Sequence, residues 1–298
     1  MRNRRRSGVL AFLAAAIGVG VFAVTANGII PQGTGGKCSP NTGQPTPSNT
    51  SCVNFQFLPN TGVPASTFKN GGFEFRVNTT YANPSDTANG GFTAKIQVSV
   101  DSDFKITPGT LPTCSKSTIA GKTPKAALTA CGPLNPSPST KNAWLLPSTS
   151  TTFNGIAHTN LGFNGCVLAF NGPKTGAGLP TITLMARVYT TGGSPCTNPK
   201  TDTASGLTIP ISAQIGSASA PYGKKIIAQN LPTSGDGLND FDVLLKRGTY
   251  LSAKCSGHNG LQNGSKFWKV KTQWTYSGTP GSNGQPDDVA NATQKCSN

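Results

Sequence analysis

The sequence predicts a mainly β fold, an antiparallel β-sandwich built as one large or two smaller sandwiches, stapled by disulfides and with very little helix. Three observations lead to this prediction. The chain holds 36 Gly and 23 Pro but only 12% charged residues, with Glu74 as its single glutamate, whereas helices usually draw on Glu, Lys, Ala and Leu. Several runs alternate apolar and polar residues, as half-buried strands do. Eight cysteines, an even number, favour a disulfide framework.

The N-terminus has the layout of a secretory signal peptide. Four arginines between Arg2 and Arg6 precede an uncharged apolar stretch over residues 8–26, and small residues at its end fit cleavage before Asn27. The rival interpretation is an uncleaved anchor, because 19 residues are close to the roughly 20 that cross a bilayer. We expect an exported protein, with membrane contact only through this segment if it stays uncleaved.

Two Pro/Gly/Ser/Thr-rich stretches mark the expected organisation of the mature chain. Residues 27–52 read as an extended N-terminal arm, and residues 53–298 as the β-sandwich region. A hinge is expected near 135–140, where Asn-Pro-Ser-Pro-Ser-Thr interrupts the pattern. A mature chain of this length is able to bury a substantial core.

The strands follow in chain order. Period-two alternation predicts strands over residues 53–58, 73–77, 92–100, 182–188, 207–215 and 268–276. Asn-Gly, Gly-Gly and Pro-Gly turns between them favour antiparallel pairing. Pro210 lies inside one run and indicates an edge strand. The only helix expected is a short one over residues 123–130.

The cysteines all follow the N-terminal segment. The simplest pairing joins sequence neighbours: Cys38 with Cys52, Cys114 with Cys131, Cys166 with Cys196, and Cys255 with Cys296. Closely spaced cysteine pairs of the kind that hold zinc are missing from the sequence. We therefore expect neither a zinc site nor a cofactor.

The charge balance is basic. The formal net charge is +15, and the chain without its signal arginines carries 21 basic and 10 acidic residues, a net +11. Such a surface favours anionic partners, for which we consider an anionic cell-wall polymer or polysaccharide. The basic residues are scattered, so a merely solvated outer face is the alternative, and no specific nucleic-acid partner is expected.

Residues with catalytic or metal-binding chemistry are few. His158 and His258 lie in no nucleophile motif and read as loop histidines. A glycosidase pair of carboxylates would need aspartates, and Asp101 and Asp103 lie two apart at a strand end, where they share a face. Asp236, Asp240 and Asp242, with Asn239, form a weak calcium candidate that matches no EF-hand spacing, and turn formation is the alternative for these aspartates.

Three tryptophans offer a binding hypothesis. Trp144, Trp268 and Trp274 would stack on sugar rings if exposed, as the tryptophans of carbohydrate-binding modules do. Trp268 and Trp274 share an alternating face with Val270, however, which favours packing in the core.

Short segments along the chain carry a resemblance. They are SVDSDFKITP at 99–108, LPTC at 111–114, ACGP at 130–133, LAFNGP at 168–173, YGKK at 222–225, FDVLL at 241–245, YLSAKC at 250–255 and the run 268–276. Over roughly residues 70–296 the chain resembles a group of uncharacterised secreted proteins of actinobacterial type. The resemblance implies a β-rich, extracytoplasmic protein and a small loop closed by Cys114 and Cys131, and it brings no activity, ligand or catalytic residue.

The sequence leaves two function classes open. The first is a secreted or cell-envelope protein without enzymatic activity, a structural or binding β-sandwich. The second is a carbohydrate-binding module or an aspartate-based carbohydrate-active enzyme. Exposed tryptophans or an open aspartate pair would favour the second class.

Overall fold

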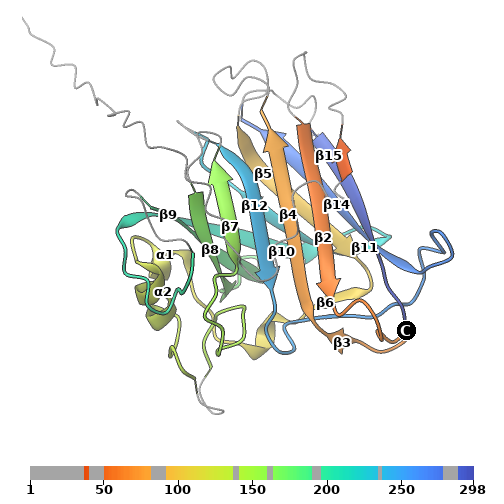
Figure 1. Ribbon diagram of the computed structural model, residues 1–298, viewed down its shortest axis with the longest axis horizontal. Helices are drawn as coiled ribbons and strands as arrows, with labels where there is room; N and C mark the ends of the chain where they lie inside the picture. The colour runs from red at the N-terminus through yellow and green to blue at the C-terminus, as the bar shows by residue number, and fades with distance from the viewer. Residues whose placement is uncertain are drawn as a thin grey trace, which may run out of the picture.

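The computed structural model describes residues 37–39, 50–81, 92–136, 141–159, 164–189, 196–233, 237–277 and 288–298 (Figure 1). The expected signal peptide, most of the arm and residues 137–140 of the expected hinge lie outside this set. Within it, the helices are too short to cross a membrane.

Most of the strands belong to one antiparallel sheet. Its strand order is β1-β2-β4-β12-β7-β8-β9-β10-β11-β5-β14-β15. In chain order the strands of this sheet are β1 (Lys37–Ser39), β2 (Thr50–Leu58), β4 (Gly72–Thr80), β5 (Thr93–Asp101), β7 (Gly155–Thr159), β8 (Asn164–Gly172), β9 (Thr181–Tyr189), β10 (Gly206–Ser217), β11 (Tyr222–Gln229), β12 (Leu238–Leu245), β14 (Phe267–Tyr276) and β15 (Asp288–Lys295). A second, three-stranded sheet has the order β3 (Lys69–Asn70), β13 (Leu251–Ala253) and β6 (Phe104–Ile106).

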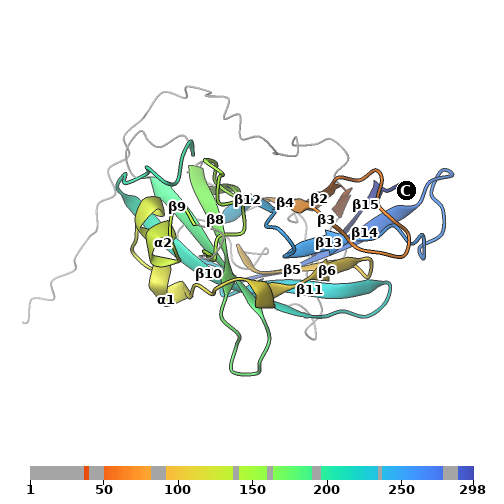
Figure 2. The same cartoon turned by 90° about the horizontal axis from the view of Figure 1, so that it is seen from below.

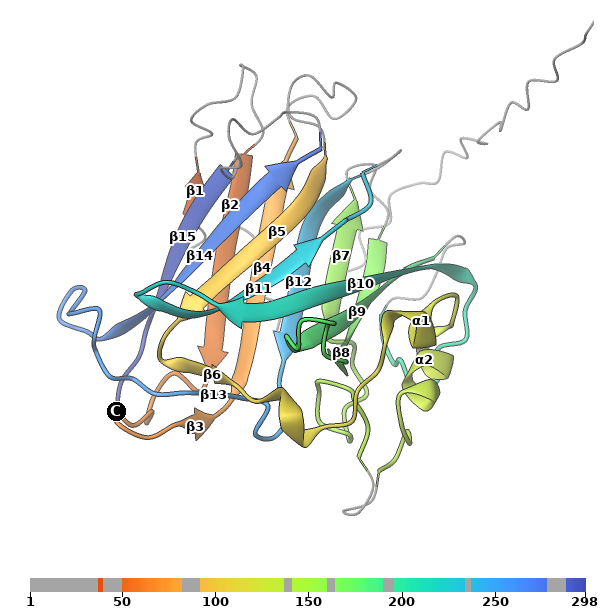
Figure 3. The same cartoon turned by 180° about the vertical axis from the view of Figure 1, so that it is seen from behind.

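The large sheet folds over on itself into two layers. Strands β2, β4, β12, β7 and β8 form one layer, and β10, β11, β5 and β14 form the other (Figure 2 and Figure 3). The sheet nearly closes where β15 meets β2. There the hydroxyls of Ser51 and Tyr276 lie 2.5 Å apart, which links β2 to β14. The expected antiparallel sandwich is confirmed, as a single continuous sheet.

The main core fills the space between the layers. Alternate residues of β2 and β14 are buried, as the period-two pattern predicts. Phe57 makes edge contacts with Phe104 and Trp268, each with ring centroids 5.4 Å apart. Such offset aromatic pairs bury much apolar surface and fix the relative position of the two layers.

A second apolar cluster lies under the helices. These are α1 (Lys116–Ile119) and α2 (Pro124–Ala130), which follow the 3-10 turn η2 (Pro108–Thr110). Thr123 caps α2 by accepting a hydrogen bond from Ala126 N, and the expected helix over 123–130 is confirmed. Ile119, Leu128 and the Cys114–Cys131 disulfide pack here on the outer side of β8 and β9.

Three of the expected neighbour disulfides are present. They are Cys114–Cys131, Cys166–Cys196 and Cys255–Cys296. The register of β1 and β2 sets Cys38 directly opposite Cys52, in line with the fourth expected pair. Residues 37–39 and 50–52 of the expected arm belong to β1 and β2, so the sheet begins earlier than the composition indicated.

The expectation for Pro210 is wrong in one respect. Its strand, β10, lies between β9 and β11 and is therefore not an edge strand. Pro210 is aligned with Met185 of β9, whereas β11 pairs with β10 only from Ala213 onward. The proline is tolerated because, among the strands that the structure describes, none pairs with that side of β10 at Pro210.

Candidate functional site

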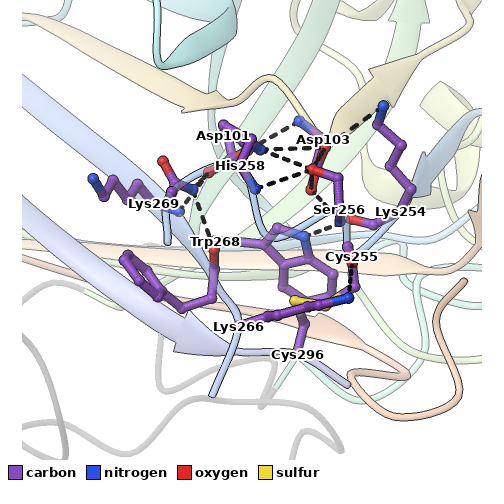
Figure 4. The surroundings of a disulfide bond; sticks show 12 residues. Asp101, Asp103, Lys254, Cys255, Ser256, His258, Lys266, Trp268, Lys269 and Cys296 are labelled. Atoms are coloured by element: carbon purple, nitrogen blue, oxygen red, sulfur yellow. Dashed lines mark hydrogen bonds and ion pairs between the residues drawn. A yellow bond between two sulfur atoms is a disulfide. The ribbon is translucent and has the colours of Figure 1, made fainter. Parts of the chain in front are cut away.

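Asp101 and Asp103 lie close together at the end of β5, as the sequence predicts. Figure 4 shows both carboxylates beside the segment that follows β13, which carries Ser256 and His258. That segment is fixed by the Cys255–Cys296 disulfide. Two parts of the chain about 155 residues apart therefore meet in one polar cluster, which we call the aspartate–histidine cluster: Asp101, Asp103, Ser256 and His258.

Asp101 is fully buried and surrounded by N–H donors. Its Oδ2 accepts hydrogen bonds from Asn259 Nδ2 at 2.6 Å and from Lys269 N at 2.9 Å. Its Oδ1 accepts from Asp103 N at 3.0 Å. Burial raises the pKa of Asp101 above its ordinary value, and these hydrogen bonds together with His258 oppose the rise.

Asp103 is buried as well, with 2% of its surface exposed. Its Oδ2 accepts a hydrogen bond from Ser256 N at 2.8 Å, and the Ser256 hydroxyl lies 2.8 Å from both carboxylate oxygens. Lys254 Nζ approaches Oδ1 at 3.8 Å. The carboxylate therefore holds the start of the loop that carries His258.

The imidazole of His258 lies between the two carboxylates. Its Nε2 is 3.2 Å from Asp101 Oδ1, and its Nδ1 is 3.5 Å from Asp103 Oδ1 and 3.0 Å from Ser256 Oγ. Nε2 also lies 3.2 Å from Ser102 Oγ. With 31% of its side chain exposed, the ring separates the buried carboxylates from solvent.

The cluster contains the serine, histidine and aspartate of a serine nucleophile site, but the Ser256 hydroxyl donates its hydrogen bond to Asp103 and not to the histidine. In such a site the histidine accepts the serine proton. Here the Ser256 hydroxyl reaches both oxygens of Asp103, so its single proton goes to a carboxylate and its lone pair is left for His258 Nδ1–H. The serine is thereby held rather than activated. The buried aspartates are equally ill placed to reach a glycosidic bond.

The same atoms form a possible metal-ligand set. One atom each from Asp101, Asp103 and His258 lie within 4.8 Å of one another. Carboxylate oxygen and imidazole nitrogen are common ligands of divalent transition metals. Sequence reasoning placed the two aspartates together but missed Ser256 and His258, because no local signal indicates contact across 155 residues.

Asp240, one of the three calcium candidates, belongs to a second ionic cluster. Asp240 accepts hydrogen bonds from Arg76 Nε at 2.8 Å and from Arg76 Nη2, and it lies 3.2 Å from His158 Nδ1. Burial raises the pKa of Asp240, but the hydrogen bonds and charges of His158 and Arg76 outweigh it, so the pKa falls below its ordinary value. The arginine supplies the positive charge that calcium would bring. Asp242 is buried and acts electrostatically on Arg76, while Asp236 lies outside the described residues.

Both histidines were expected in loops, and one is not. His158 is aligned with Asn164 and Asp240 within β7, so it is a strand residue. His258 does lie in a loop, at a turn after β13.

The tryptophans do not supply a stacking surface. Trp144, Trp268 and Trp274 are 1%, 0% and 0% exposed. Trp144 donates to Asn154 Oδ1 at 2.8 Å, and Trp268 donates to Lys254 O at 2.7 Å. The sugar-stacking hypothesis for these rings is therefore corrected in favour of the core, because burying an indole of this size contributes more than a surface position does.

The outward side of β11, β5 and β14 carries a basic face. We define this basic face as Lys95, Gln97, Lys225, Lys269, Lys271 and Gln273. The register aligns Ser99 of β5 with Lys225 of β11 on one side and with Lys271 of β14 on the other. One lysine therefore lies on each side of β5 in the same row. The only acidic residue in these three strands is Asp101, which is buried at the end of β5.

Side-chain contacts order the basic face. Gln97 Nε2 donates to Gln273 Oε1 at 2.8 Å across the β5–β14 pair. The ammonium groups of Lys269 and Lys271 lie over the rings of Phe267 and Tyr222, each 5.4 Å from the ring centroid. Cation–π contacts of this kind hold an ammonium in place without neutralising its charge.

No protein-family model, curated protein or solved structure matches the chain.

Proposed function

We propose that the chain is an exported, non-catalytic β-sandwich protein that binds an anionic polysaccharide of the cell envelope through its basic face. The observation that carries the proposal is the group of lysines on β11, β5 and β14, in which Lys225 and Lys271 flank Ser99 in one row and the only acidic residue of the three strands is the buried Asp101. Charge complementarity then selects a partner that bears carboxylate or phosphate groups.

Export is supported by the disulfides together with the N-terminal layout. Disulfides form and persist in oxidising compartments, and three are present here. The arginine-led apolar segment over 8–26 is what a chain needs to reach such a compartment.

The geometry of the basic face favours a polymer over a small anion. Lys225 and Lys271 are separated by the width of β5, about 10 Å for two strand spacings. Lys269 and Lys271 follow each other on the same side of β14. A small anion contacts one such charge at a time, whereas a chain of repeated anionic units contacts several at once and gains from multivalency. Gln97 and Gln273 add amide groups that hydrogen-bond sugar hydroxyls.

A binding assay on the disulfide-intact chain tests the proposal. Polygalacturonate immobilised on a sensor is the probe, with neutral amylose as the control polymer. We expect binding to polygalacturonate that weakens strongly as salt is raised, because salt screens exposed charges. Equal binding to amylose, or affinity unchanged by salt, would reject a charge-based site.

Matched lysine variants locate the site. The double variant Lys225→Gln with Lys271→Gln removes two charges from the basic face, and we expect roughly tenfold weaker binding, since exposed charge contacts contribute up to about 1 kcal/mol each. The control, Lys116→Gln with Lys174→Gln, removes the same charge at exposed positions outside these strands. Equal losses in the two doubles would reject this face, and stronger competition by double-stranded DNA than by soluble polygalacturonate would reject a polysaccharide partner.

A further inference from the structure

We propose that Asp101, Asp103 and His258 bind a divalent transition-metal ion of the zinc type. This inference does not depend on the polysaccharide proposal, because it rests on the aspartate–histidine cluster and not on the lysines. It assigns a ligand-binding role to side chains that otherwise act only as hydrogen-bond partners.

The two carboxylates are preorganised so that one oxygen of each faces the imidazole. Backbone and amide donors hold the Oδ2 atoms: Asn259 Nδ2 and Lys269 N on Asp101, and Ser256 N on Asp103. The Oδ1 atoms are the ones nearest to His258. Outer donors that orient a ligating carboxylate are a regular feature of metal sites, and they lower the cost of collecting the ligands.

The spacing fits a small cation. Ligands at about 2.0 to 2.2 Å from a metal in tetrahedral or octahedral arrangement lie about 3.0 to 3.5 Å from one another. Asp101 Oδ1 and His258 Nε2 are 3.2 Å apart, and one ligand atom each from Asp101, Asp103 and His258 lie within 4.8 Å of one another. An ion requires the partly exposed ring of His258 to turn one nitrogen toward both buried carboxylates. The exposed side of the imidazole also gives the ion its path from solvent.

Charge supports the assignment. Two buried carboxylates carry two negative charges, and among the described residues the one lysine ammonium in contact with them, Lys254, is 3.8 Å from Asp103. The side-chain oxygen of Asn259, beside Asp101, is buried and has no hydrogen-bond partner within the described part of the chain. A divalent cation held by both carboxylates balances their two negative charges.

The ligand types select the metal class. One imidazole nitrogen with two carboxylate oxygens suits Zn²⁺ or Mn²⁺ better than Ca²⁺, which prefers six to eight oxygens. The neighbouring cysteines contribute no thiolate, because Cys255 and Cys296 are joined in a disulfide. A soft thiophilic ion is therefore not the expected occupant.

Calorimetric titration of the chelator-treated, disulfide-intact chain tests the site, with ZnCl₂ as the ligand and CaCl₂ as the comparison. We expect one Zn²⁺ per chain and little heat with Ca²⁺. His258→Ala should weaken zinc binding by at least about tenfold, since loss of a single supporting group already costs 10- to 100-fold. The control is His158→Ala, which removes the other histidine of the sequence, next to Asp240, and should leave zinc affinity unchanged.

A second measurement, the thermal midpoint of unfolding with and without zinc, distinguishes loss of the metal site from misfolding of a variant. Zinc should raise the thermal midpoint of the wild type and of His158→Ala but not of His258→Ala, because an ion that binds only the folded state stabilises it. Asp103→Asn should reduce the zinc-induced shift in the same way. The site is rejected if zinc does not bind saturably, if His258→Ala binds zinc as well as the wild type, or if both histidine variants lose the same affinity.

Discussion

The side-chain amide of Gln294 hydrogen-bonds both backbone polar groups of Phe57. Its Oε1 accepts from Phe57 N at 2.6 Å, and its Nε2 donates to Phe57 O at 3.2 Å. Phe57 lies in β2 and Gln294 in β15, the strands that meet where the large sheet nearly closes. The side chain thus takes the place of a backbone partner on the side of β2 away from β4, where within the described ranges β1 pairs only with residues 51–53.

Gln294→Ala should destabilise the protein by about 1 to 3 kcal/mol, because it leaves the Phe57 N–H and carbonyl without this partner. Urea unfolding followed by circular dichroism measures the loss. Thr293→Ala, at the exposed neighbouring position of β15, is the control and should stay within about 0.5 kcal/mol of the wild type. Equal stabilities of the two variants would show that the junction of β2 and β15 does not depend on this contact.

Arg76→Gln should cost about 3 to 5 kcal/mol at neutral pH, because it leaves the buried Asp240 carboxylate with His158 as its remaining charge partner. The pKa of Asp240 is lowered in the folded wild type. Its contribution to stability is therefore present above the ordinary pKa of 3.8 and is lost as pH falls through the lower folded value.

The pH dependence separates this charge effect from a packing defect. The stability difference between wild type and Arg76→Gln should shrink as pH is lowered from about 6 toward about 3 in urea titrations, because protonated Asp240 no longer needs the arginine. A difference that stays constant over this range would contradict the assignment.

Removing the Cys255–Cys296 disulfide should cost more than removing Cys114–Cys131. The two bonds span 41 and 17 residues, and the chain-entropy estimate gives about 4 and about 3 kcal/mol respectively. Paired Cys→Ser variants compared by urea unfolding measure both losses. A reversed order would show that the denatured chain is not the main origin of the stabilisation.

Trp268→Phe should destabilise the protein more than Trp274→Phe. Both indoles are fully buried, but the N–H of Trp268 donates to Lys254 O, whereas the N–H of Trp274 has no hydrogen-bond partner among the described residues. The difference should be about 1 to 2 kcal/mol, the cost of leaving the partly buried carbonyl of Lys254 without this donor. Thermal unfolding of the two variants measures it, and a larger loss for Trp274→Phe would contradict the hydrogen-bond argument.

The sequence alone predicted much of the fold because its signals are local. Alternation in residues 92–100 and 268–276 requires one face to be buried, and both segments are strands. Thr123 and Pro124 are typical helix-start residues, and α2 begins there. The neighbour pairing held for three disulfides because the chain between each pair doubles back: through the helices α1 and α2 for Cys114–Cys131, and through the antiparallel pairs β8–β9 and β14–β15 for the other two.

Strand order and the contacts between distant residues depended on the tertiary structure. Nothing local indicates that β5 lies between β11 and β14, and that placement alone lines up Lys225, Ser99 and Lys271. The meeting of His258 with Asp101 likewise depends on how the segment after β13 packs against the end of β5. The alternation of apolar and polar residues specifies which face of a strand is buried. Which other strand packs against that face depends on contacts between residues far apart in the chain.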